Sequence, residues 1–108
     1  MPTVIYAVLR RVYNHSSMRA FEVSVNGEKL CVAGIGDDGV LTSIVSWVAR
    51  HGDGDLMLSV GGLYSQTEEH VNWISHRPLS VGDEIHVTII ETDSVDTPAR
   101  KRPHDTTS

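Results

Sequence analysis

The sequence predicts an all-β protein, a small antiparallel β-sandwich or barrel of six to seven strands. Three observations predict it. Within several short segments apolar and polar residues alternate, and Gly, Asp and Asn turn residues recur about every ten residues. Asn26-Gly27, a residue pair that favours a tight hairpin turn, separates two such segments. With 108 residues, of which 40% are hydrophobic, the chain is long enough for one domain with a single core.

The clearest strand runs from Ile85 to Glu91. Ile85, Val87 and Ile89 fall on one face of it, because side chains alternate along a strand. β-Branched residues dominate the segment, and they suit a pleated sheet. We expect these three side chains to share one interior with four residues that flank the Asn26-Gly27 turn: Phe21, Val23, Leu30 and Val32.

Asn26-Gly27 predicts a β-hairpin whose strands cover residues 21–25 and 28–32. A two-residue loop fixes the register, so we expect Val23 to lie opposite Leu30. Cys31 then falls on the other face, opposite Glu22.

The segment from Val40 to Arg50 fits two structures. As a helix it places Val40, Leu41, Ile44, Val45 and Val48 on one arc, which would make the fold α+β with one helix at about 39–50. As a strand it is rich in β-branched residues and alternates around Leu41, Val45 and Trp47. The strand is favoured because the rest of the chain is β.

Three further segments complete the expected strands: residues 3–12, 56–60 and 69–74. The first is apolar on both faces, so we expect it to be central or exchanged with another chain. Gly61-Gly62 indicates a β-bulge, a close backbone approach or the end of a strand.

We expect three regions along the chain. Residues 1–17 form an N-terminal strand or a dispensable extension, and residues 18–93 form the β domain core. Residues 94–108 form a flexible C-terminal tail, because their polar and proline-containing composition supplies little apolar surface to bury.

The net charge of -5 is unevenly distributed. Residues 21–94 hold twelve acidic and three basic side chains, so this part of the chain would repel a phosphate backbone, and nucleic-acid binding is disfavoured. The basic cluster Arg100-Lys101-Arg102 is typical of a solubilising tail. A single cysteine indicates a reducing compartment, and the apolar run from Val4 to Leu9 is too short to cross a membrane. We therefore expect a cytoplasmic protein.

Histidine is frequent, and His70 and His86 are the best candidates for a metal site. Both fall on predicted outer strand faces, with Glu84 two residues before His86 on the same face. Two imidazoles and a carboxylate would suit zinc or non-haem iron. No spacing motif forces the three together, however, and histidines on a solvated face are the simpler explanation of the pattern. Calcium is the alternative cofactor, with Asp37, Asp53 or Asp55 as its ligands.

No set of residues in the sequence has the spacing of a known catalytic motif. Cys31 as a nucleophile would need a nearby base and a lowered pKa, and its expected neighbour Glu22 would raise that pKa. Trp47, Tyr64 and Trp73 form either core or an aromatic binding platform. We expect a non-catalytic domain that binds a protein partner or a second copy of itself, through an exposed sheet edge or the N-terminal strand. The alternative is a metal-binding module or metal-dependent enzyme that uses the His/Glu site.

Overall fold

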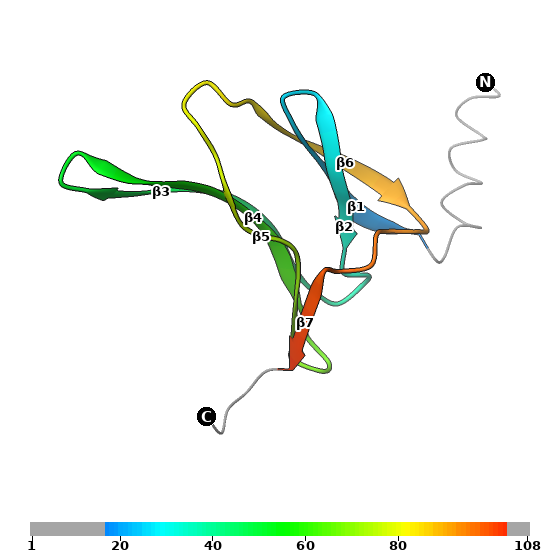
Figure 1. Ribbon diagram of the computed structural model, residues 1–108. Helices are drawn as coiled ribbons and strands as arrows, with labels where there is room; N and C mark the ends of the chain where they lie inside the picture. Colours follow the sequence, from blue (N-terminus) through cyan, green and yellow to red (C-terminus); the bar gives the residue numbers. More distant parts are fainter. Residues whose placement is uncertain (1–16, 104–108) are drawn as a thin grey trace, which may run out of the picture.

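The computed structural model describes residues 17–103, and these residues form only β-strands and loops (Figure 1). The expected N-terminal strand at 3–12 lies outside the described residues. The strands are β1 Met18–Val25, β2 Glu28–Gly34, β3 Gly39–Arg50, β4 Asp53–Tyr64, β5 Glu69–Pro78, β6 Ile85–Thr92 and β7 Arg100–Pro103. The all-β prediction is confirmed, and the segment at 40–50 is a strand.

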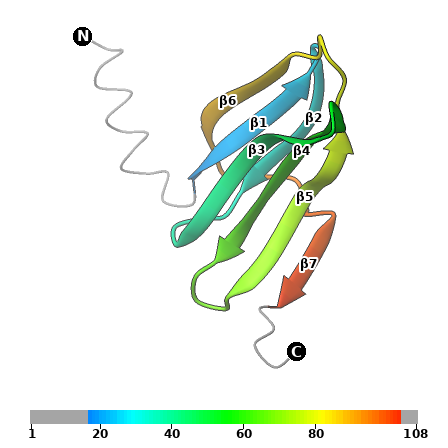
Figure 2. The same cartoon turned by 90° about the vertical axis from the view of Figure 1, so that its left-hand side faces the viewer.

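The strands form two open antiparallel sheets (Figure 2), of order β2-β1-β6 and β3-β4-β5-β7. The sheets come closest where β2 faces β4 and β5, and from there they diverge, so that β3 and β6 lie far apart (Figure 1). Between them lies one core of eight buried residues: Val23, Val25, Cys31, Ala33, Leu58, Val60, Val71 and Trp73. The structure is therefore a sandwich that is packed along one side and open along the other.

The β1–β2 hairpin confirms the predicted turn and corrects the predicted register. Asn26 and Gly27 both have positive φ values, 54° and 83°, as a type I′ turn requires. Ser24 lies opposite Lys29 as expected, but Val23 lies opposite Cys31 and not Leu30. The register shifts by one residue between Val23 and Ser24, at a β-bulge that leaves Leu30 of β2 as the extra residue. Cys31 is thereby turned onto the core face, and the expected pairing of Cys31 with Glu22 is wrong.

Strand β4 is longer than the sequence indicates. A second tight turn, with positive φ at His51 and Gly52, joins β3 directly to β4, which begins at Asp53 and continues through both glycines to Tyr64. Gly61 confirms the expected close approach: an added Cβ would lie 2.5 Å from Asn72 Oδ1 and 2.7 Å from the Val71 carbonyl. The β4–β5 register shifts on both sides of Val60.

Strand β6 forms as predicted, but only part of its apolar face is buried. Val23 is fully buried, whereas Val87, directly opposite on β6, is 41% exposed, and Ile89 is 69% exposed. The expectation of one shared interior is therefore wrong for Val87 and Ile89, and also for Val32, because the bulge gives the core face of β2 to Cys31 and Ala33. The reason is the divergence of the sheets, which leaves β6 beyond the cover of the larger sheet (Figure 1).

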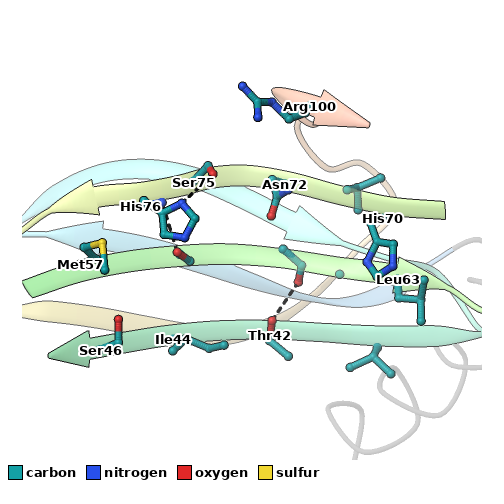
Figure 3. A pocket seen from close by; sticks show the side chains of 15 residues that line it. Thr42, Ile44, Ser46, Met57, Leu63, His70, Asn72, Ser75, His76 and Arg100 are labelled. Carbon is teal, nitrogen blue, oxygen red and sulfur yellow. Dashed lines mark hydrogen bonds between the residues drawn. The ribbon is translucent and has the colours of Figure 1, made fainter. Parts of the chain in front are cut away.

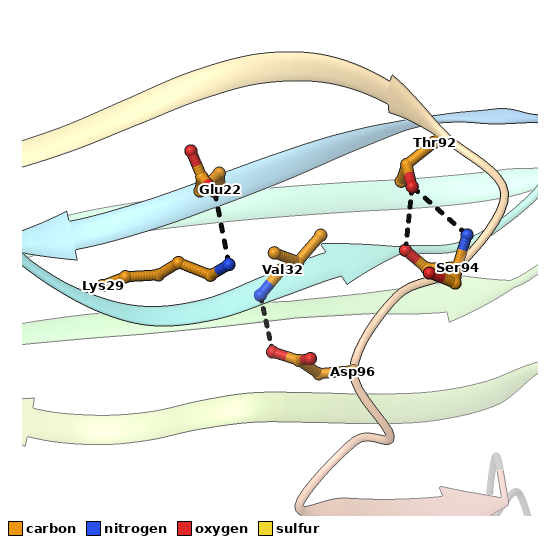
Figure 4. A network of polar contacts seen from close by, with 6 residues as sticks. All are labelled: Glu22, Lys29, Val32, Thr92, Ser94 and Asp96. Atoms are coloured by element: carbon orange, nitrogen blue, oxygen red, sulfur yellow. Dashed lines mark hydrogen bonds and ion pairs between the residues drawn. The ribbon is translucent and has the colours of Figure 1, made fainter.

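The segment after β6 differs from the expected flexible tail within the described residues. It crosses from one sheet to the other and ends in β7, which pairs with β5. On the way Asp96 contacts both sheets: its carboxylate accepts a hydrogen bond from the Val32 N–H at 2.8 Å (Figure 4), its own N–H donates to the Val32 carbonyl, and its carbonyl accepts from Trp73 Nε1 at 2.7 Å. We call residues 93–99 the strap, because they tie the two sheets together.

The opposite end of the sandwich is closed by the β5–β6 loop. Asn26 of the first hairpin turn donates from Nδ2 to Asp83 and accepts at Oδ1 from the Glu84 N–H. The hydrogen bonds from Asn26 and from the Ser80 N–H hold the pKa of Asp83 below its usual value. The described residues contain no helix that is long and apolar enough to cross a membrane.

Candidate interaction surface

Strand β3 carries most of the exposed apolar surface of the described residues. Of their eight large exposed hydrophobic residues, five lie on this one strand: Val40, Ile44, Val45, Trp47 and Val48. They are between 39% and 65% exposed. We call these five residues the β3 apolar surface. Exposed apolar side chains concentrated on one strand are typical of contact sites, because leaving them in water is unfavourable.

The exposed side chains lie on both faces of β3. The side chains of Val40, Ile44 and Val48 project from the outer face of the larger sheet, together with Thr42 and Ser46 between them. Val45 and Trp47 lie on the inner face, towards the open side of the sandwich. Trp47 lies over Gly54 of β4, where an added Cβ would be 2.9 Å from its Nε1.

Within residues 17–103, β3 pairs only with β4, so its other edge is unpaired. The two-residue turn makes Arg50 and Asp53 a hydrogen-bonded pair. At the other end of β3 the Ser65 N–H donates to the Asp38 carbonyl at 3.2 Å, so Asp38, like Arg50, directs its backbone groups at β4. Even-numbered residues of β3 therefore direct their backbone groups at β4, and odd-numbered residues direct theirs at the free edge.

This edge lacks the usual protection against strand addition. Edge strands are normally short, charged, interrupted by proline or bulged. The segment from Val40 to Ala49 has no charged residue and no proline, and its pairing with β4 runs without a register shift. The edge strand at the other side of the same sheet, β7, has four residues, namely three basic ones and Pro103. β3 is thus a ready template for another strand.

An open groove lies on the outer face of the larger sheet, across β3, β4 and β5 (Figure 3). Thr42 Oγ1 donates to the Gly61 carbonyl at 3.3 Å in its floor, and the His76 N–H donates to Ser59 Oγ at 3.2 Å. His76 Nδ1 lies 3.3 Å from Ser75 Oγ. Sequence reasoning missed this groove; only the paired glycines in β4 gave a signal of it. Its lining combines aliphatic and small polar side chains with His70, His76 and Arg100.

The structure brings together two of the three predicted metal ligands. His86 Nε2 lies 3.8 Å from a Glu84 carboxylate oxygen, and both side chains are largely exposed. His70 lies on β5 in the other sheet, at the groove. His70 and His86 therefore lie in different sheets and not on neighbouring strands. No group of three His, Cys, Asp or Glu side chains in the described part of the chain is arranged to hold a metal ion.

The acidic residues considered for calcium lie at opposite ends of β3. Asp37 and Asp38 precede the strand, whereas Asp53 and Asp55 follow it across the turn. Each pair occupies an ordinary turn or hairpin end, and the strand between them separates the two pairs.

The chemistry of Cys31 is that of a core residue. Burial raises the pKa of its thiol to about 11, and the negative charge of Asp96 adds to the shift. A thiol with this pKa is protonated at neutral pH and is a weak nucleophile. The three aromatic residues do not form one platform: Trp73 is buried, Tyr64 packs partly against the core and Trp47 is exposed.

The chain matches no protein family model, no curated protein and no solved structure.

Proposed function

We propose that the protein is a binding module that acts by protein–protein association, including association with itself. The observation that supports this proposal most directly is the β3 apolar surface on an edge strand whose free side no described strand pairs. A strand that adds to such an edge gains backbone hydrogen bonds and covers apolar side chains at the same time. Neither gain requires a catalytic group.

The open side of the sandwich adds a second apolar area. Val87 and Ile89 of β6 face it from the smaller sheet, and Val45 and Trp47 face it from the larger one. Val87 lies opposite the buried Val23, and Val45 lies opposite the buried Leu58, so both exposed residues adjoin the core. An association at β3 would therefore extend the core of the domain.

The proposal is tested by placing a charge on the β3 apolar surface. In Ile44→Lys, a strand that pairs with β3 must accommodate a lysine at its centre, which disfavours association. The matched control is Val81→Lys, because Val81 is 95% exposed and lies in the β5–β6 loop, away from β3. Both substitutions should leave the free energy of unfolding of a single chain unchanged within about 0.5 kcal/mol.

Size-exclusion chromatography with light scattering over a range of concentrations measures the outcome. We expect the wild-type protein and Val81→Lys to associate and Ile44→Lys to stay monomeric. A wild-type protein that is monomeric at all concentrations, or association that Ile44→Lys does not weaken, would contradict the proposal.

A further inference from the structure

Two copies of β3 have complementary side chains when they lie side by side and run antiparallel. When two copies run antiparallel with Ile44 opposite Ile44, Val40 lies opposite Val48 and Thr42 lies opposite Ser46. On this outer face apolar side chains meet apolar side chains and hydroxyl groups meet hydroxyl groups. Such cross-strand pairs are the unit of sheet stabilisation.

The inner face follows the same register. Leu41 lies opposite Trp47 of the second copy, and Ser43 lies opposite Val45. Moving the register so that Val45 lies opposite itself would place Ile44 opposite Ser46 and Thr42 opposite Val48, so that apolar side chains would meet hydroxyl groups along the outer face. The pattern of side chains therefore selects one register among those that the backbone permits.

Charge complementarity supports the same register. Asp38 precedes β3 and Arg50 ends it, and both are exposed. In the register centred on Ile44, Asp38 of each copy lies opposite Arg50 of the other copy. The two-fold symmetry makes this opposite-charge pair twice, once at each end of the contact.

The free backbone groups coincide as well. Leu41, Ser43, Val45 and Trp47 direct their N–H and C=O groups at the free edge, as the alternation along β3 requires. In this register Ser43 meets Val45 and Leu41 meets Trp47, so each edge-facing residue meets another. Ile44 and its copy form a pair without mutual hydrogen bonds, at the symmetry axis.

We infer that a second copy of this chain is the partner of β3: the two strands pair antiparallel around a two-fold axis at Ile44 and join both four-stranded sheets into one continuous sheet. This inference rests on the proposed function, because it names the partner and the geometry of the association proposed there. An interface of this kind closes on itself, so it forms a dimer and not a filament.

Cysteine cross-linking tests the register. In an antiparallel pair without mutual hydrogen bonds the Cα atoms are about 4.5 Å apart, within the range that a disulfide spans. Under mild oxidation Ile44→Cys should form a disulfide-linked dimer, whereas wild type, whose only cysteine is the buried Cys31, should not. Val40→Cys and Val48→Cys should each fail to cross-link alone and should cross-link when mixed.

Charge reversal tests the ends of the contact. Asp38→Arg and Arg50→Asp each place like charges opposite one another twice, so each should raise the dissociation constant of the dimer about tenfold or more at low salt. The double variant exchanges the two charges and should restore wild-type affinity. A mixture of the two single variants should form a heterodimer in preference to either homodimer.

The outcomes separate this inference from the proposed function. If Ile44→Lys abolishes association but Ile44→Cys does not cross-link and the double charge variant does not restore affinity, β3 has another occupant and the inference is overturned. Cross-linking of Thr42→Cys or Ser46→Cys alone, without Ile44→Cys, overturns the register. Cross-linking of Ile44→Cys that appears only after residues 1–17 are deleted assigns the edge in the full chain to that segment and overturns the inference. Association that Ile44→Lys leaves intact contradicts the proposed function itself.

Discussion

At the scale of single residues, Cys31 shows how one extra residue decides the environment of a side chain. An uninterrupted hairpin would direct the thiol away from the core, beside Glu22. The β-bulge, where the β1–β2 register shifts between Val23 and Ser24, instead turns Cys31 of β2 into the core, where it is 5% exposed. Both arrangements raise the pKa, but burial is the larger cause in the structure and Asp96, not Glu22, is the charge that adds to it.

This raised pKa predicts how stability depends on pH. The folded protein holds the thiol proton more tightly than the unfolded chain does, so the contribution of Cys31 to stability is complete below its ordinary pKa of 9.0 and is lost as the pH rises towards about 11. We expect the difference in free energy of unfolding between wild type and Cys31→Ala to shrink over that interval. Urea unfolding at several pH values measures it, and a constant difference up to pH 11 would contradict the burial of the thiol.

At the scale of elements, the strap holds the two sheets together through one residue. Asp96→Ala removes the acceptor of the Val32 N–H and should lower the free energy of unfolding by about 1 kcal/mol. Asp96→Asn keeps an oxygen acceptor and should cost less. Chemical denaturation measures both, with Asp93→Ala, an exposed position of the same segment, as the control. Equal effects of alanine at Asp93 and Asp96 would show that the strap carries no specific contact.

The same elements show what the sequence could predict. Asn26-Gly27 predicts its hairpin because a two-residue turn needs two positive φ values, and the β-branched residues of β3 predict a strand. The bulge between Val23 and Ser24 has no comparable signal in the sequence, since it depends on which residues the core accommodates. The strap is missed because its hydrogen bonds join Asp96 to residues far away in the chain, and its polar composition resembles that of a tail.

The candidate site is predicted less well than the fold, for a related reason. An exposed sheet edge is expected, but naming β3 as that edge requires the strand order, which period-two patterns do not contain. His70 and His86 illustrate the converse: each occupies a strand as expected, and the strand order places them in different sheets. Local patterns specify elements, whereas sites depend on how the elements are arranged.

At the scale of the whole molecule, the divergence of the sheets is tested by one matched pair of substitutions. Val23 and Val87 lie directly opposite one another on the same face of the smaller sheet, but only Val23 is covered by the larger one. Val→Thr keeps the shape and adds a hydroxyl group. At Val23 this group is buried, and we expect a loss of about 2 kcal/mol in the free energy of unfolding. At Val87 it reaches water, and we expect a change within about 0.5 kcal/mol.

The comparison is made by urea unfolding in the Ile44→Lys background, so that association through β3 does not cover the open side. A small cost at Val87 beside a large one at Val23 follows if the sandwich is open in the single chain. Equal costs at the two positions would mean that Val87 is covered without a partner. The open side would then belong to the core, and only β3 itself would remain as a surface for association.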